Sequence, residues 1–341
     1  MHVPDHFLND PTSIVTAVAA TACVAGAVTV AHRDGRSGAG RVSPLGVAAT
    51  TALIFGLQMV NYPVASGTSG HVLGGALAAA LLGPAWGVVS LTMVVVLQSL
   101  IFADGGLTAL GTNIILMAVV GTLVGWWVQR GVGALATGNG TGPAERQRAR
   151  AVARIAMSVG AGALVSVVAA AGVFTALFAI GGNARVGVGA LAGQMIGVHA
   201  LVGIGEALIT AGVVAAVAGA VPGWCAADSR GAGGAWLDAR QTRLRPAGIL
   251  GGIAVVAAAV LSPWASGAPD GLEATARAVG FAGTARDHAL AGLPLADYGE
   301  ATGLSVQLVG LIGLVVCVAV GLAVGRVLAV GRPEHLAAAR A

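Results

Sequence analysis

Nine apolar runs separated by short polar segments are the feature that most limits what this chain can fold into. They cover residues 12–31, 43–60, 70–82, 84–102, 107–129, 152–180, 190–220, 247–265 and 304–328. Charged residues make up 9% of the 341 residues and hydrophobic residues 56%, whereas a soluble domain has about 25% charged residues. The pattern predicts an all-α polytopic membrane protein. The third run is short and rich in glycine, which favours a tilted or re-entrant segment, since about 20 residues cross a bilayer upright.

The basic residues, all of them arginine, divide unevenly between the two sides that these runs define. If the N-terminus is outside, only Arg185, Arg277 and Arg286 fall in outer segments. The other 15 of the 18 are Arg33, Arg36, Arg41, Arg130, Arg146, Arg148, Arg150, Arg154, Arg230, Arg240, Arg243, Arg245, Arg326, Arg332 and Arg340. Cytoplasmic segments carry such an excess of basic residues. We therefore expect nine spans in a cell membrane, with the N-terminus outside and the C-terminus in the cytoplasm.

The spacing of the runs also divides the chain into two modules. Residues 1–220 are expected to form a seven-span bundle, and residues 221–245 a polar cytoplasmic linker. Residues 246–341 then add two further transmembrane helices around an extracytoplasmic stretch, 266–303, which is the most acidic part of the chain. Its charge pattern is typical of a solvated loop. We expect this stretch to attract cations weakly and to assist uptake without holding a high-affinity site.

The first two residues, Met1-His2, can chelate a metal ion in a plane. No removable signal peptide is expected before them, because polar residues such as Asp5 and Asp10 replace its basic and apolar regions. The terminal amine, the His2 amide nitrogen and the His2 imidazole supply three coplanar nitrogens and leave one place open. Tetragonal nitrogen geometry suits Ni(II), Cu(II) and low-spin Co(II). The alternative is a histidine that follows Met1 by chance.

His71 is the candidate fourth ligand, because it opens the third apolar run on the same predicted face. It lies in a stretch of small residues, S-G-T-S-G-H-V-L-G-G at 66–75, in which Ser69 is a nearby polar group. A close approach to a backbone chelate is possible there. The alternative role for a lone histidine in a membrane is a hydrogen bond between helices.

Other polar residues in or beside the apolar runs allow two interpretations. Gln98, Asp104 and Asn113 can form a polar shell that orients the metal ligands. For Asp104, capping of the D-G-G turn is an equally good explanation. His199 and Glu206 are seven residues apart on one helix face, so they form either a structural network or a transport-linked pair.

Four separated motifs carry a resemblance to a known family. They are M-H-V-P-D at the start, G-G-A-L-A-A-A-L-L-G-P, Q-S-L-I-F-A-D-G-G-L-T-A-L-G-T-N and H-A-L-V-G-I-G-E-A-L-I-T. Residues 1–220 thereby resemble the CbiM/NikM family, the cobalt- and nickel-specific substrate-binding membrane subunits of energy-coupling-factor transporters. P-D-G-L-E at 269–273 is similar to the PDGLE domain of the two-span companion subunit (CbiN/NikN type). One departure is His6, which stands where the family usually reads Gly. Its imidazole can add a weak axial ligand or point to solvent.

The resemblance implies a site of four nitrogens: the Met1 amine, the His2 amide and imidazole, and the His71 imidazole. It also implies Co²⁺ or Ni²⁺ as the transported substrate, without deciding between them, and no organic cofactor. The implied partners are a membrane coupling subunit and ATPase subunits, with the lipid bilayer around the chain and no nucleic acid. The chain has no lysine and thus no phosphate-binding G-x-x-x-x-G-K-[ST] loop, so we do not expect it to hydrolyse ATP. Alternatives are an integral-membrane metalloenzyme and a passive divalent-metal channel.

Overall fold

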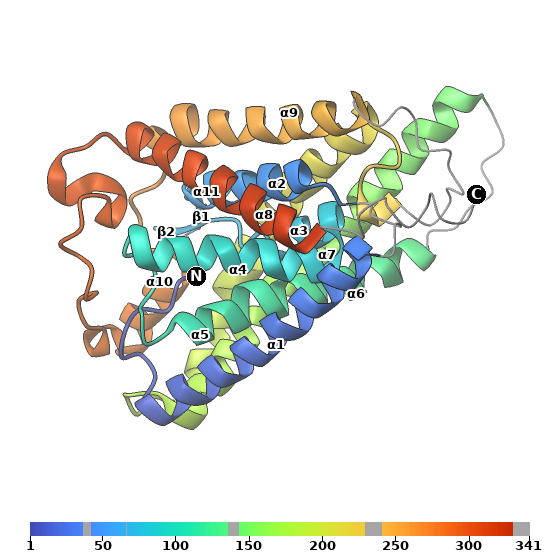
Figure 1. Ribbon diagram of the computed structural model, residues 1–341. Helices are drawn as coiled ribbons and strands as arrows, with labels where there is room; N and C mark the ends of the chain where they lie inside the picture. The colour runs from blue at the N-terminus through green and yellow to red at the C-terminus, as the bar shows by residue number, and fades with distance from the viewer. Residues whose placement is uncertain (37–41, 66, 136–142, 229–240, 330–341) are drawn as a thin grey trace.

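The computed structural model describes residues 1–36, 42–65, 67–135, 143–228 and 241–329 (Figure 1). Five of the arginines used to predict the orientation lie outside these residues: Arg41, Arg230, Arg240, Arg332 and Arg340. Part of the expected linker, 229–240, and the end of the second module, 330–341, lie outside them too.

Helices account for nearly all the regular structure of the described residues. The α-helices are α1 (Asp10–Arg36), α2 (Pro44–Gln58), α3 (Gly75–Leu82), α4 (Pro84–Ile101), α5 (Leu110–Asn113), α6 (Gly121–Leu135), α7 (Ala144–Gly181), α8 (Val188–Ala220), α9 (Gln241–Val255), α10 (Gly271–Val279) and α11 (Val306–Ala329). Two π-helical segments continue others, η1 (Ile114–Val120) and η3 (Val256–Leu261), and the 3-10 turns are η2 (Ala226–Asp228), η4 (Ser262–Trp264), η5 (Ala282–Thr284) and η6 (Ala296–Thr302). The strands β1 (Tyr62–Ala65) and β2 (Thr68–Gly70) form one antiparallel hairpin.

Seven helical segments among the described residues are long and apolar enough to cross a membrane. They are α1, α4, α5 with η1 and α6, α7, α8, α9 with η3 and η4, and α11. This confirms the prediction of an all-α polytopic membrane protein. Which terminus faces outside stays a prediction.

The second and third apolar runs form shorter helices than the others. α2 has 15 residues and α3 has 8. At about 1.5 Å per residue these helices are about 22 and 12 Å long, against about 30 Å of hydrocarbon. The third run is therefore short, as its sequence predicts, whereas the second is shorter than a full span. α2 ends early because the chain turns into the β1–β2 hairpin, and the Gln58 side chain donates a hydrogen bond to the Leu73 carbonyl beyond it (2.8 Å).

The short α3 is held inside the bundle by close backbone contact. A Cβ at Gly75 would lie 2.4 Å from the carbonyl carbon of Gly121 in α6. Only glycine allows these two helices to approach so closely. Gly75 opens the helix that follows His71, so this contact helps to fix the histidine relative to the bundle.

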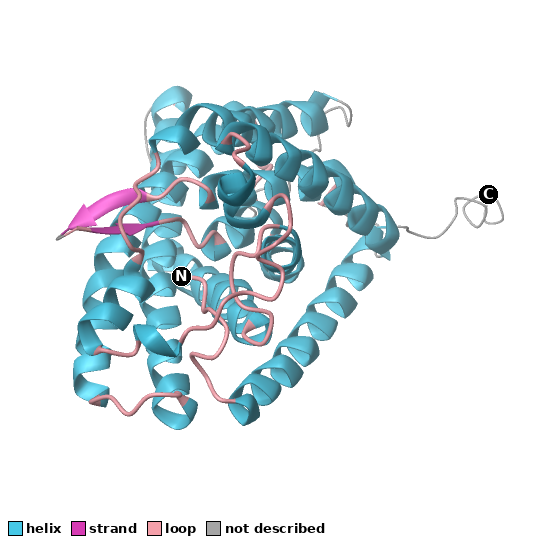
Figure 2. Cartoon of the chain, turned by 90° about the vertical axis from the view of Figure 1, so that its left-hand side faces the viewer, coloured by secondary structure: helices cyan, strands magenta, loops and turns pink. Residues whose placement is uncertain are grey.

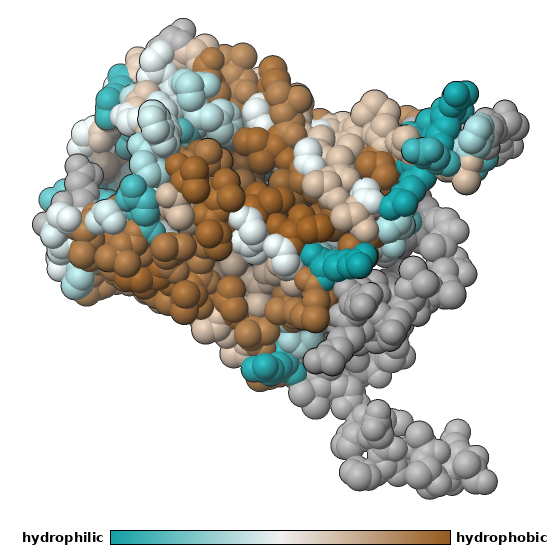
Figure 3. Space-filling model, turned by 90° about the horizontal axis from the view of Figure 1, so that it is seen from above, coloured by the Kyte–Doolittle hydropathy of each residue, from teal (hydrophilic) through white to brown (hydrophobic). Residues whose placement is uncertain are grey.

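The two modules pack together through α11 and α2. A Cβ at Gly321 of α11 would lie 2.7 Å from the Ala48 Cα of α2, and one at Gly325 would lie 2.8 Å from the Pro44 Cα. The N-terminus and residues 266–303 lie at the same end of the molecule, on the left in Figure 1 and facing the viewer in Figure 2. A broad hydrophobic band crosses the surface shown in Figure 3, and exposed hydrophobic side chains of the molecule include Val260 and Val315. Such a band fits contact with lipid.

Candidate metal-binding site

The N-terminal segment runs into the bundle rather than into solvent. Met1 is 3% exposed, and Val3 is fully buried. The Val3 N–H donates to Asn113 Oδ1 (2.8 Å), and the Asn113 side chain donates back to the Val3 carbonyl (3.1 Å). Asp5 accepts hydrogen bonds from the Thr108 N–H (2.7 Å) and hydroxyl (2.6 Å). Asn113 thus holds the two peptide groups that flank the Val3 Cα.

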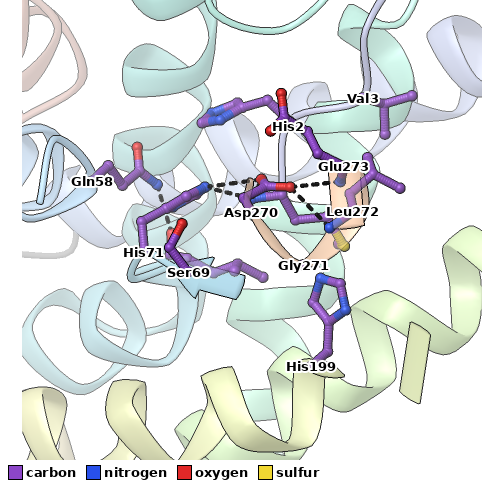
Figure 4. Close-up of polar contacts among 12 residues, drawn as sticks. His2, Val3, Gln58, Ser69, His71, His199, Asp270, Gly271, Leu272 and Glu273 are labelled. Carbon is purple, nitrogen blue, oxygen red and sulfur yellow. Dashed lines mark hydrogen bonds and ion pairs between the residues drawn. The ribbon is translucent and has the colours of Figure 1, made fainter. Parts of the chain in front are cut away.

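The Met1 amine contacts His71, which lies beside Asp270 in Figure 4. The amine nitrogen lies 2.5 Å from His71 Nε2, and His71 Nδ1 donates to the Val72 carbonyl (3.1 Å). That second bond leaves Nε2 as the nitrogen with a free lone pair, in the way that metal-binding histidines are usually oriented. Two neighbouring nitrogens, each about 2.0 Å from one metal ion, lie about 2.8 Å apart. The pair is therefore spaced as two adjacent ligands.

His2 lies over His71 and is held by side chains at the end of α4. The two imidazole centroids are 5.2 Å apart and their planes differ by 18°. His2 Nδ1 lies 3.1 Å from Asp104 Oδ1, and Nε2 donates to Gln98 Oε1 at 3.2 Å. Burial lowers the pKa of His2, while Asp104 acts to raise it. A planar chelate therefore requires the ring to turn Nδ1 from Asp104 toward the Met1 amine.

Asp270 is the residue at the site that sequence reasoning missed. Its Oδ2 lies 3.3 Å from the Met1 amine and 3.9 Å from His71 Nε2, and its side chain is 16% exposed. Burial acts to raise the pKa of this carboxyl, but the Met1 ammonium group and His71 hold it below its ordinary value. The expectation of a solvated acidic loop is therefore wrong at Asp270, because a charge pattern along the chain does not show which charges meet in space.

Ser69 contacts the second module rather than the histidines. Its N–H donates to the Pro269 carbonyl (2.9 Å) and its hydroxyl to the Ala268 carbonyl (2.7 Å). These bonds fix the two residues before Asp270 against β2. Ser69 therefore positions the segment that carries Asp270 instead of the two histidines.

Tyr298 of η6 is a second contribution from residues 266–303 that the sequence did not suggest. Its hydroxyl donates to Asp104 Oδ2 (2.7 Å) and accepts from Gln98 Nε2 (3.3 Å). Its ring stacks on Phe102, with centroids 5.3 Å apart. The same two side chains that hold His2 are therefore themselves held by the second module.

Glu206 and His199 do not form the shared network that their spacing suggested. Glu206 is fully buried and accepts hydrogen bonds from the N–H groups of Leu73 (2.8 Å) and Gly74 (3.0 Å). His199 Nδ1 donates to the Met195 carbonyl of its own helix (2.8 Å). Its ring lies against Gly271, where a Cβ would approach to 2.9 Å. Glu206 thus anchors the chain just after His71, and His199 supports the start of α10.

His6 takes up a left-handed backbone conformation that favours glycine, with a φ of 65°. Its carbonyl accepts a hydrogen bond from the Asn183 side chain (2.7 Å), in the loop between α7 and α8. The carboxylate oxygen that lies near the Met1 amine and His71 belongs to Asp270.

The donors of this site are partly main-chain groups. Among the described residues, no three or more His, Cys, Asp or Glu side chains are grouped so as to hold a metal ion. Cys23, Cys225 and Cys317 are free thiols. That the terminal amine and the first amide serve as metal donors at this end of the bundle stays a prediction of the Met1-His2 pattern.

The fold defines a multi-pass membrane protein with nitrogen donors gathered at one end of its bundle. Residues 2–224 match the family model for the cobalt uptake substrate-specific transmembrane region (CbiM), and residues 245–330 match the PDGLE domain. The chain therefore belongs to the CbiM family of cobalt and nickel transport membrane components, with a PDGLE domain in the same chain. This confirms the resemblance seen in the four sequence motifs.

Several known proteins are similar to parts of this chain. A Haloquadratum walsbyi protein, provisionally named as a metal transport protein, is 39% identical over 227 residues, which cover 65% of this chain and 92% of the relative. The fused nickel transport protein NikMN of Rhodobacter capsulatus is 38% identical over 124 residues, 36% of this chain and 35% of that protein. A crystal structure of a transition metal transporter covers 64% of this chain and 93% of its own, with 27% identity and a TM-score of 0.48. The match to the fused protein thus spans about a third of its length.

Proposed function

We propose that this protein is the substrate-specific membrane component of an energy-coupling-factor transporter that imports Co²⁺ or Ni²⁺. The ion is bound by four nitrogens in a plane at the extracytoplasmic face. The observation that carries the proposal is the 2.5 Å contact between the buried Met1 amine and His71 Nε2. This contact joins the first residue of the chain to the loop before α3 at the spacing of two adjacent metal ligands.

The chemistry of the donors limits which ions can bind. A deprotonated amide between an amine and an imidazole excludes Mg²⁺ and Ca²⁺, which take oxygen ligands, and disfavours Zn²⁺, which prefers a tetrahedral set. The bonds of Val3 with Asn113 hold the first peptides in place. An ion bound in this way links the N-terminus to the loop that carries His71. Binding and release of the ion therefore both act on the N-terminal segment and on this loop.

Energy for transport is proposed to come from separate subunits. The sequence has no lysine and so lacks the phosphate-binding loop of ATPases. A tight planar site also suits a driven importer better than a passive channel, since conduction requires weak binding at several sites. The proposed partners are a membrane coupling subunit and ATPase subunits. Residues 266–303 share the end of the bundle that carries the site, which fits their common extracytoplasmic location.

Uptake of radiolabelled cobalt and nickel by cells tests this function. Cells that produce the chain with a coupling subunit and ATPases should accumulate either ion in an ATP-dependent way, and His71→Ala should abolish uptake. His32→Ala is the matched control, because His32 contacts the Leu328 carbonyl at the far end of α1. Uptake that survives His71→Ala, or ion flux through this chain without ATP, would overturn the proposal.

A further inference from the structure

Asp270 reaches the site with one oxygen while its other oxygen is engaged elsewhere. Oδ1 accepts hydrogen bonds from the N–H groups of Leu272 (2.8 Å) and Glu273 (2.9 Å), so it caps the start of α10. Oδ2 points to the Met1 amine at 3.3 Å and to His71 Nε2 at 3.9 Å (Figure 4). The carboxylate is thus oriented by its own helix, and one oxygen remains available to a ligand.

The position of Oδ2 is close to that of an apical ligand above a planar site. An oxygen about 2.2 Å above a metal ion lies about 3.0 Å from nitrogens bound about 2.0 Å away in the plane. The observed distances of 3.3 and 3.9 Å to the amine and to His71 exceed this value by less than 1 Å. A shift smaller than one bond length would therefore bring Oδ2 into contact with an ion bound at both nitrogens.

Residues of the first module hold the segment that carries Asp270 in place. The Ser69 N–H and hydroxyl bind the two carbonyls that precede the aspartate. On the other side, Gly271 lies against the His199 ring, where a Cβ would approach to 2.9 Å. The carboxylate is therefore held from β2 and from α8, which is the kind of support that a metal ligand needs.

Charge balance favours a carboxylate at this position. A divalent ion bound by a neutral amine, two neutral imidazoles and one amide anion keeps a single positive charge. The Met1 ammonium that the ion replaces carries the same charge, and Asp270 already faces it. Asp104, beside His2, is 25% exposed and more open to water. A buried charge is costly unless it is paired, so Asp270 is suited to neutralise the site both before and after loading.

We propose that Asp270 of the PDGLE domain is an apical oxygen ligand to the bound ion, so that the second module completes the metal site and favours cobalt. The preference follows from electron count. In a planar field, low-spin Ni(II) has two electrons in the orbital that points to the apical position, whereas low-spin Co(II) has one, so an apical oxygen is repelled less by cobalt. This inference rests on the proposed function, because it presumes the planar nitrogen set.

The test uses the full-length protein purified in detergent and loaded with Co(II) or Ni(II) alone. Asp270→Asn keeps a capping oxygen for α10 and puts a non-coordinating NH₂ group in place of Oδ2. X-ray absorption of the cobalt-loaded wild type should show four nitrogens and one oxygen, and the variant should show four nitrogens. The affinity of the variant for Co(II) should fall by about 10- to 100-fold, as for other ligand-supporting groups, and its affinity for Ni(II) by less.

Asp287→Asn is the matched control, since Asp287 is an exposed aspartate of the same stretch. It should leave the cobalt ligand shell and both affinities unchanged. An Asp270→Asn protein with an unchanged ligand shell would overturn the assignment of Asp270, whether or not its affinity falls. If His71→Ala binds either ion like the wild type, the planar nitrogen site itself fails, and that result is distinct from a failure of Asp270.

Discussion

The two imidazoles of the site are held by different parts of the molecule. His71 follows the β1–β2 hairpin, donates to a main-chain carbonyl, and precedes two N–H groups anchored by Glu206 of α8. His2 instead contacts two side chains at the end of α4, and both of these contact Tyr298 of the second module. The His71 half therefore rests on main-chain bonds, whereas the His2 half rests on side chains that can exchange partners.

This difference indicates how an ion could enter a buried site. The His71 loop offers a fixed nitrogen beside the Met1 amine, and His2 turns from Asp104 to complete the plane. We therefore expect changes at the edge between Met1 and His71 to abolish transport, and changes around His2 to have graded effects.

Extending the chain by one residue before Met1 should have the largest effect. The extension turns the present amine into an amide and moves the free amine away from His71. The new terminus can form an X-X-His chelate, which supplies four nitrogens by itself and favours Cu(II) over Ni(II) and Co(II). We expect the extended protein to bind metal without transporting it, as measured by equilibrium binding and by uptake of radiolabelled cobalt and nickel. Normal uptake by this variant would contradict a role for the amine.

A change of pH should have the next largest effect, which is on the affinity for the metal ion. Binding through the His2 amide nitrogen releases the proton of that amide, so the affinity for the metal ion should fall by about tenfold or more for each unit by which the pH is lowered. The pKa of Asp270 lies below its ordinary value, so the stability from its pairing is present above that ordinary value and is lost only as pH falls through the lower one. Asp270→Asn should thus lower the affinity without changing the slope. Metal titrations at several pH values measure this, and an affinity that does not change with pH would exclude amide ligation.

Glu206→Gln should loosen the fixed half of the site. The amide can accept with only one oxygen, so the N–H of Leu73 or of Gly74 loses its partner in a buried place. We expect the free energy of unfolding to fall by about 1 to 3 kcal/mol, measured by thermal unfolding in detergent. Metal affinity should fall by about tenfold, measured by metal titration. Glu273→Gln, at an exposed position in the first turn of α10, is the control. Unchanged affinity in Glu206→Gln would show that the loop does not depend on this anchor.

Tyr298→Phe should produce a smaller effect on the adjustable half. It removes the hydroxyl that donates to Asp104 and leaves the ring stacked on Phe102. Loss of one such hydrogen bond costs about 1 kcal/mol, so we expect metal affinity to change by about fivefold in calorimetry. Thr29→Val is the control, because it removes a hydroxyl hydrogen bond to the Ala25 carbonyl within α1, one turn before His32. Equal effects of both variants would exclude a specific role for Tyr298.

The sequence predicted the residues of the first module that gather at the site, because each lies in a compact motif at the same end of an apolar run. Met1, His2, His71, Gln98, Asp104 and Asn113 are all found there. It also predicted a helical membrane bundle with a short third segment. It did not predict the short α2, because hydropathy alone does not show where the chain turns into a hairpin.

The contribution of the second module could not be predicted, since its residues are some 200 to 270 positions away from those they meet. A local signal was present at Asp270, which stands three residues before Glu273 in a pattern typical of a helix start. That pattern predicts α10 but not its contact with the terminal amine. The local sequence signal at Tyr298 is weaker than that at Asp270. Its backbone has a positive φ of 53°, and no sequence rule predicts this conformation for tyrosine.

His6→Gly should have the smallest effect, and it separates two roles for this residue. His6 has a φ of 65°, which costs a residue with a Cβ about 1 kcal/mol and costs glycine almost nothing. We expect His6→Gly to raise the free energy of unfolding by about 0.5 to 1 kcal/mol and His6→Ala to leave it nearly unchanged, both measured by denaturant unfolding. Neither variant should change the affinity for Co(II) or Ni(II), because the apical position belongs to Asp270. If both variants lose affinity while Asp270→Asn does not, the His6 imidazole is the axial ligand instead, and the second module only covers the site.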